Sequence, residues 1–279
     1  MEIKFDKVHF TYDKINFHKR EVLNNINLIF KEGKINALIG KSGSGKTTLV
    51  EIIYGVLRPS SGNVLIDNVI MNEETKERIR FDIGMVFQDV NEQFFNKTVK
   101  EELEANLKLY NYRIDELQKR IIDALIMVGL SDEYLNLNIA LLSSGEKKKV
   151  ALASALVLNP KILILDEPMV GLDLKSKKEL IKLLRLLKNR YKKTIVIISN
   201  NLDFILENVD YVYVLNDKKI VMEGKKLDVF KQVDKLKKYG IIVPNIIFFE
   251  DLVLKKKGIK LGYRDEINDL IKDIYRCAK

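Results

Sequence analysis

The clearest structural signal in the chain is Gly40-Lys41-Ser42-Gly43-Ser44-Gly45-Lys46-Thr47-Thr48. This stretch follows a short apolar run, Ile35 to Ile39, and precedes a segment of helical character, Thr48 to Tyr54. A strand, a loop of the form G-x-x-x-x-G-K-[ST] and a helix in this order are typical of a phosphate-binding loop. Glycines let the backbone fold around phosphate oxygens, and amide N–H groups at the helix start supply a positive field. The stretch predicts a phosphate site in an α/β fold.

The residue types in this loop also suggest roles. We expect Lys46 to reach the terminal phosphates of the ligand and Thr47 to be a ligand of Mg²⁺. The loop residues expected to contact the ligand are Gly40, Ser42, Gly43, Ser44, Gly45, Lys46, Thr47 and Thr48.

A second polar site follows the apolar strand Ile162 to Leu165, which ends in Asp166 and Glu167. Parallel strands present their carboxyl ends at one edge of a sheet, so these carboxylates are expected near the phosphate loop. Asp166 can hold Mg²⁺ through water, and Glu167 can polarise an attacking water as general base. Without the phosphate loop, a buried strand with a solvated acidic end would be the simpler interpretation.

The composition limits the possible classes of protein. A chain of 279 residues with 47% hydrophobic residues can bury one large core. Its apolar runs are shorter than the roughly 20 residues that span a bilayer, and its amino terminus lacks the pattern of a secretory signal. We therefore expect a cytoplasmic protein. A single cysteine, Cys277, and two histidines, His9 and His18, predict neither an internal disulfide nor a zinc cluster.

The net charge of +9 is compatible with nucleic acid, an anionic lipid surface or a polyphosphate ligand. Its lysine blocks, Lys147 to Lys149 and Lys255 to Lys257, lack interleaved aromatic residues that could stack on bases. We interpret these blocks as solvated surface and expect no nucleic-acid partner.

The order of elements predicts the domain organisation. Short β segments come first, at Ile3 to Phe5, Val8 to Tyr12, Ile26 to Phe30 and Val64 to Ile66. Apolar strands with helical stretches between them then indicate a parallel sheet covered on both faces, at Ile35 to Ile39, Ile162 to Leu165, Thr194 to Ile198 and Tyr211 to Leu215. We expect a main domain over residues 1–225 with an inserted helical subdomain at about 97–159, and a small helical appendage over residues 226–279. Within the insertion, the helical spacing rests on Leu103, Leu107, Tyr110, Leu117, Ile121, Leu125 and Val128.

Between the two polar sites lies Leu142-Ser143-Ser144-Gly145-Glu146, which resembles the signature motif L-S-G-G-[QE] of the ATP-binding cassette (ABC) family. The spacing of Ser143 and Glu146 is also that of a helix capping box. The resemblance implies a P-loop NTPase ABC nucleotide-binding domain with an antiparallel β subdomain. It also implies that Ser143, Ser144, Gly145 and Glu146 meet the γ-phosphate of ATP bound on a second subunit, and hence a dimer.

Further segments of this chain resemble motifs of the family, and together the resemblance covers roughly residues 1–225. Tyr12 resembles the aromatic residue that stacks on adenine, although a lone tyrosine on a strand is more often packing. Gln88 resembles the glutamine that contacts Mg²⁺ and senses the membrane partner. Gly171-Leu172-Asp173 resembles the loop that crosses the dimer interface.

A narrower resemblance concerns Phe87 to Phe95 and Thr98 to Glu102, which look like the F-Q-x-P-E-x-Q-L-F and T-V-x-x-E segments of energy-coupling factor transporters. Proline is absent here, and the spacing before Gln93 is one residue shorter. The insertion Lys14 to Arg20 and the tail after Tyr239 resemble the second ATPase of that family. The resemblance implies an importer of vitamins or transition-metal ions. Its partners would be a second ABC ATPase in a heterodimer or homodimer, a transmembrane coupling protein and a substrate-binding membrane protein, and the chain would lie peripherally on the cytoplasmic face of the cell membrane.

One residue departs from the family pattern. The family places a histidine that contacts the γ-phosphate where this chain has Asn200, and no histidine follows His18. Asparagine can donate a hydrogen bond but cannot carry positive charge. Three functions therefore stay open: an ATPase coupled to transport, a nucleotide-gated subunit whose own site hydrolyses ATP slowly, and a soluble ABC ATPase of the iron–sulfur assembly type.

Overall fold

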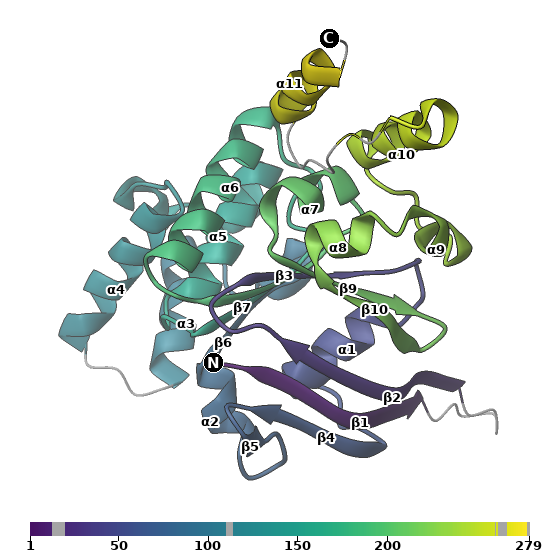
Figure 1. The fold of residues 1–279 in the computed structure, drawn as a ribbon. Helices are drawn as coiled ribbons and strands as arrows, with labels where there is room; N and C mark the ends of the chain where they lie inside the picture. The colour runs from purple at the N-terminus through teal and green to yellow at the C-terminus, as the bar shows by residue number, and fades with distance from the viewer. Residues whose placement is uncertain (13–19, 110–113, 260, 262–266, 278–279) are drawn as a thin grey trace.

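The computed structural model describes residues 1–12, 20–109, 114–259, 261 and 267–277. Within these residues the strands form two sheets, one of four strands and one of six, with helices between and outside them (Figure 1). The α/β class expected from the sequence is confirmed.

The larger sheet carries the phosphate loop. Its strands are β6 (Ile83–Val86), β7 (Ile162–Asp166), β8 (Thr194–Ile198), β3 (Ile35–Ile39), β9 (Tyr211–Asn216) and β10 (Lys219–Lys225). They lie in the order β10-β9-β3-β8-β7-β6, and every neighbouring pair is parallel except β10 with β9. Every residue of β3, β7 and β8 is buried, as expected for strands covered on both faces. In this order β8 separates the phosphate-loop strand β3 from the acidic strand β7.

The smaller sheet is antiparallel. It contains β1 (Ile3–Tyr12), β2 (Arg20–Phe30), β4 (Ser61–Ile66) and β5 (Val69–Ile70), in the order β2-β1-β4-β5. The two short strands predicted at Ile3 to Phe5 and Val8 to Tyr12 are a single strand, which is a correction. The pairing of β1 with β2 is irregular between Phe5 and Val8, where Lys7 has a φ of 49°. Pairing with β2 resumes at Val8, so the strand continues through the irregularity.

Helices connect the sheets and cover the larger one. They are α1 (Lys46–Ile53), α2 (Lys76–Phe81), α3 (Val99–Leu109), α4 (Ile114–Met127), α5 (Ser144–Leu156), α6 (Leu174–Asn189) and α7 (Leu202–Asn208). The residues 97–159 contain α3, α4 and α5, and of the residues that carried the predicted helical spacing Leu103, Leu107, Leu117, Ile121, Leu125 and Val128 are buried. Tyr110 lies outside the described residues. The division of the chain into domains stays a prediction.

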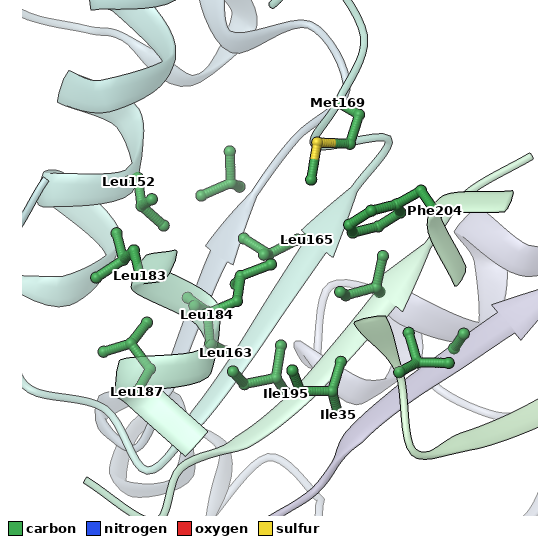
Figure 2. Close-up of a cluster of buried hydrophobic side chains, with 14 of the residues drawn as sticks. Ile35, Leu152, Leu163, Leu165, Met169, Leu183, Leu184, Leu187, Ile195 and Phe204 are labelled. Atoms are coloured by element: carbon green, nitrogen blue, oxygen red, sulfur yellow. The ribbon is translucent and has the colours of Figure 1, made fainter. Parts of the chain in front are cut away.

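One core cluster lies between the larger sheet and helices α5 and α6. Figure 2 shows Leu152 of α5 and Leu183, Leu184 and Leu187 of α6 against Leu163 and Leu165 of β7. Met169, in the turn after β7, points into the same cluster beside Phe204. This packing fixes α5 relative to the end of β7, and both elements carry predicted site residues.

The last part of the chain consists of α8 (Lys226–Phe230), α9 (Val233–Lys238), α10 (Asn245–Lys257) and α11 (Ile267–Cys277). Phe230, Leu236 and Ile247 are buried and join the core cluster, so α8, α9 and α10 are docked on the main body. The predicted helix after Pro244 is confirmed as α10. Among the described residues, none of the helices combines the length and apolar character needed to cross a bilayer.

Candidate nucleotide site

The phosphate loop joins the carboxyl end of β3 to the start of α1, as the sequence predicts. Its geometry depends on glycine at two positions. A Cβ atom on Gly40 would lie 2.2 Å from the Leu215 carbonyl oxygen, on the neighbouring strand β9. Gly45 has a φ of 104°, and a Cβ atom there would lie 3.0 Å from the side chains of Val22 and Leu23. Other residues at these positions would push the loop away from β2 and β9.

Polar groups inside the loop are suited to bind an anion. Lys46 Nζ donates hydrogen bonds to the carbonyl oxygens of Gly40, at 2.7 Å, and Lys41, at 3.0 Å. Burial lowers the pKa of Lys46, while the carboxylates of Glu167 and Asp166 oppose that shift. The Ser44 hydroxyl is buried and has no hydrogen-bond partner among the described residues. The Lys46 ammonium, which is hydrogen-bonded to neutral carbonyl oxygens, and the unsatisfied Ser44 hydroxyl are both suited to bind the phosphates of a nucleotide.

The acidic pair lies two strands away from the loop, with β8 between. Glu167 Oε2 accepts a hydrogen bond from the Ser199 hydroxyl at 3.0 Å, and Oε1 accepts one from the Asn200 backbone N–H at 2.8 Å. Burial, with a smaller effect of the Glu167 charge, raises the pKa of Asp166 to about 6. A bound cation would favour the ionised form of this buried carboxylate.

The backbone of Glu167 is held in an unusual conformation. Its φ is 44°, in the left-handed region that non-glycine residues seldom adopt. Its N–H donates to the Ile198 carbonyl oxygen at 2.8 Å, and its own carbonyl oxygen accepts from the Val170 N–H at 3.2 Å. Such strain persists only where the surrounding structure over-determines it, and it is concentrated at functional sites.

These segments border one cavity of about 280 Å³. Its lining includes the predicted residues Tyr12, Ser42, Gly43, Gly45, Lys46, Thr47, Thr48, Gln88, Asp166, Glu167 and Asn200. Arg20 and Val22 of β2 also line the cavity, and the sequence did not predict a role for either in the site. Ser199 was likewise missed, although a hydroxyl directly after the apolar strand Thr194 to Ile198 was a usable signal. The cavity therefore unites residues from six separate parts of the chain.

Tyr12 lies at the edge of this cavity, at the end of β1. Its ring meets Phe10 edge-on, with 4.8 Å between the ring centres, and its hydroxyl lies 3.2 Å from the Thr48 hydroxyl. Tyr12 is 37% exposed, so part of its ring is free to contact a ligand. This placement is compatible with stacking on adenine, and the stacking stays a prediction.

Oxygen donors for a metal ion converge on the same cavity. The Thr47 hydroxyl, the Asp166 carboxylate and the Gln88 amide oxygen are the hard ligands that Mg²⁺ prefers. Gln88 is exposed, and Asp166 is buried. These residues fit a magnesium ion that arrives with the nucleotide.

The signature segment lies elsewhere. Ser143, Gly145, Glu146 and Asp173 do not line the phosphate cavity, whereas Ser144 borders a wider cleft of about 710 Å³ with Thr47, Gln88 and Asp166. The capping box is present: the Ser143 hydroxyl accepts from the Glu146 N–H, and Glu146 Oε2 accepts from the Ser143 N–H at 2.9 Å.

The side chains of Glu146 and Asp173 both form hydrogen bonds at the start of a helix. Hydrogen bonds from Ser143 and Tyr134 lower the pKa of Glu146 to about 2. Asp173 caps α6 by accepting a hydrogen bond from the Ser176 N–H at 2.7 Å. In this chain the carboxylates of both residues therefore stabilise local structure, and Ser143 and Ser144 at the amino-terminal end of α5 are exposed.

Comparisons with known proteins agree with this geometry. The model of the ABC transporter family matches residues 23–170. The chain is 36% identical over 265 residues to the energy-coupling factor transporter ATP-binding protein EcfA2 of Clostridium perfringens, covering 94% of this chain and 93% of that protein. The corresponding EcfA2 protein of Clostridium acetobutylicum is 31% identical over 278 residues, covering 99% and 94%.

Solved structures are similar as well. The chain is 32% identical to the ATP-binding cassette MJ0796, solved as a dimer bound to ADP and Pi, with a TM-score of 0.73 over 80% of this chain and 98% of that one. It is 31% identical to CbiO1 of Clostridium perfringens, part of the ABC transporter complex CbiONQ, with a TM-score of 0.72 over 89% and 98%. The chain belongs to the ABC transporter family and, within it, to the energy-coupling factor transporter ATP-binding proteins.

Proposed function

We propose that this chain binds ATP with Mg²⁺ and hydrolyses it as one ATPase subunit of an energy-coupling factor importer of vitamins or transition-metal ions. The observation that carries the proposal is the single cavity bordered by the phosphate loop, the acidic pair Asp166 and Glu167, and the end of β8. The similarity to EcfA2 proteins over most of the chain supports the transporter class.

The chemistry follows from the groups around the cavity. The amides of the phosphate loop and Lys46 would bind the β- and γ-phosphates. Glu167 would orient a water against the γ-phosphate and accept its proton, since its carboxylate is held by Ser199 and the Asn200 N–H. Thr47, Asp166 and Gln88 would hold Mg²⁺, which offsets negative charge on the phosphates when it is bound.

The proposed partners follow from the position of the signature. Ser143 to Glu146 lie at the start of helix α5, and none of them lines the phosphate cavity of its own chain. A second ABC ATPase, in a heterodimer or a homodimer, would present its nucleotide there, because a helix start favours an anion. A transmembrane coupling protein and a substrate-binding membrane protein would complete the importer, with this chain peripheral on the cytoplasmic face of the cell membrane.

A second candidate function rests on Asn200. The residue is exposed at the cavity, and its backbone N–H makes the contact to Glu167, which any residue except proline could make. Its side chain cannot supply the positive charge that histidine could bring to the γ-phosphate. Loss of one preorganised contact to a transition state commonly costs on the order of a hundredfold in rate. The site on this chain would then bind ATP but hydrolyse it slowly, while its signature serves the partner.

Turnover of the assembled complex tests both ideas. Glu167→Gln in this chain is compared with the matching change of the partner's general base. A loss of ATP hydrolysis in both variants would support an ATPase dimer, and a much larger loss from the partner's change would support the slow site. Equal losses would contradict the slow site. The transporter assignment is tested by purifying the tagged chain from native membranes in mild detergent. Recovery of soluble proteins alone would contradict it.

A further inference from the structure

The lysine run after the signature segment is not the solvated charge block that the sequence suggested. Lys147, Lys148 and Lys149 are each partly buried, and each ammonium contacts a different segment. Lys147 Nζ donates to the Asn91 side chain at 3.3 Å, and Lys149 Nζ pairs with the Glu179 carboxylate on α6 at 2.8 Å. Lys148 reaches the turn that follows β7. The first turns of α5 are thus linked to their surroundings by three partly buried lysines.

Lys148 contacts the main chain of the turn directly after the proposed general base. Its Nζ donates hydrogen bonds to the carbonyl oxygens of Glu167, at 3.2 Å, Pro168, at 3.3 Å, and Val170. Ser144, one helical turn earlier on the same face of α5, donates to the Gly171 carbonyl oxygen at 3.4 Å. Helix α5 therefore holds the segment from Glu167 to Gly171 along its length.

This turn needs such support. Glu167 has a φ of 44°, and its carbonyl oxygen also accepts the Val170 N–H that closes the turn. From the core side, Met169 is 5% exposed and points toward Leu165 and Phe204 (Figure 2). Apolar packing of Met169 fixes the depth of the turn but is non-directional. A cation among the carbonyl oxygens fixes their direction, because charged hydrogen bonds are strong and directional.

We propose that Lys148 is a positioning residue for Glu167: it holds the strained turn against α5 so that the Glu167 carboxylate faces the nucleotide cavity. The inference rests on the general-base role proposed for Glu167. It also links the signature segment to this chain's own nucleotide site. Helix α5 begins with the signature, which is offered to the partner's nucleotide, and it also carries Lys148, which orients the chain's own base.

Three variants separate this role from general structural support. Lys148→Met keeps the length and apolar character of the stem and removes the donors. Lys148→Arg restores a long cation with several donors, so it is expected to recover most of the lost function. Lys149→Met is the matched control, since its ammonium pairs with Glu179 on α6 and does not reach the turn. Thermal unfolding and ATP affinity of each variant check that the fold and the phosphate site are intact.

The first readout does not depend on catalysis. Amide hydrogen exchange of the peptide spanning Glu167 to Leu172 reports whether the turn is held, through the N–H groups of Val170 and Leu172. Lys148→Met is expected to speed this exchange roughly tenfold, because a hydrogen bond to a charged donor typically shifts an equilibrium by that amount. Lys148→Arg and Lys149→Met are expected to stay near wild type. Unchanged exchange in Lys148→Met would overturn the proposal. It would show that the packing of Met169, and not Lys148, holds the turn in place.

The second readout is phosphate release in the assembled complex, measured over hours with the partner's general base changed so that this chain's own site is followed. Lys148→Met is expected to lower kcat about tenfold with KM for ATP unchanged, as for a group that acts through the base. In the Glu167→Gln background it is expected to have no further effect. A loss of the same size in that background would overturn the proposal. Absence of release even before Lys148 is changed would contradict the role of Glu167, while the exchange result still decides the position of the turn.

Discussion

The backbone N–H of Asn200, two residues beyond the end of β8, donates a 2.8 Å hydrogen bond to Glu167 Oε1, so this residue orients the proposed base through its main chain. The Ser199 hydroxyl holds the other carboxylate oxygen at 3.0 Å. Both contacts survive a change of the side chain at position 200. The effect of that side chain on the γ-phosphate can therefore be tested without moving the base.

Asn200→His is expected to raise ATP turnover at this chain's own site by about tenfold or more, because a protonated imidazole can add a charged contact to the transition state. Turnover is measured in the complex with the partner's general base changed. Asn200→Ala is the control and should leave the rate near wild type. A faster rate from both variants, or from neither, would contradict a role for the missing imidazole.

Lys46→Met is expected to abolish the stabilisation of the chain by ATP. At a ligand concentration a hundred times the Kd, a binding site stabilises a protein by about 2.7 kcal/mol. Thermal unfolding with and without ATP measures the effect, and Lys178→Met, at an exposed position of α6, is the control. Retention of the full shift in Lys46→Met would place the nucleotide elsewhere.

Asp166→Asn is expected to stabilise the nucleotide-free chain at pH 8 by about 3 kcal/mol, since burial raises the pKa of Asp166 to about 6. The folded state keeps this proton at a pH at which the unfolded state has lost it. The stability that the proton provides is complete below about pH 4 and is lost as the pH rises through about 6.

The measurement is urea unfolding at pH 8 and pH 5 without nucleotide or Mg²⁺. The advantage of the Asp166→Asn variant should shrink at pH 5, where the wild-type carboxyl is mostly protonated. The same variant should lose activation of ATP hydrolysis by Mg²⁺ at both pH values. An advantage that does not change with pH would show that charge burial at Asp166 is not its source.

Ser143→Ala is expected to lower the free energy of unfolding by about 1 kcal/mol, because it removes the cap from the start of α5. Glu146 would lose the hydrogen bond that the Ser143 hydroxyl donates to its carboxylate at 2.6 Å but keep the one from the Ser143 N–H, so its pKa should rise from about 2. NMR titration of Glu146 and chemical unfolding check both effects. The control is Ser131→Ala, whose hydroxyl reaches the exposed carboxylate of Glu133 at 3.4 Å. Similar losses from both changes would argue against a special role for the cap.

Strands and helices with strong local patterns could be predicted closely. The bounds of β3 and β8 agree with the apolar runs Ile35 to Ile39 and Thr194 to Ile198, because strands buried on both faces are apolar throughout. Strand β6 was not predicted, since four residues that include Gly84 carry little signal. The single strand β1 was predicted as two, because Asp6 and Lys7 interrupt the apolar pattern at the irregularity in its pairing.

The sequence by itself determined the parts of the site that lie close together along the chain. The phosphate loop, the acidic pair Asp166 and Glu167, and the capping box of Ser143 and Glu146 each depend on residue types at fixed short spacings. Local backbone geometry then suffices to relate such residues to one another. These motifs were also enough to identify the family to which the chain belongs.

The tertiary structure alone showed which distant segments meet. An apolar strand has the same sequence pattern whichever strands lie beside it, so only the sheet order shows β8 between β3 and β7. That order brings Ser199 and Asn200 to the carboxylate of Glu167. In the same way, the lysines of α5 look like surface charge until the helix packs against the sheet, and only that packing carries Lys148 to the turn after the base.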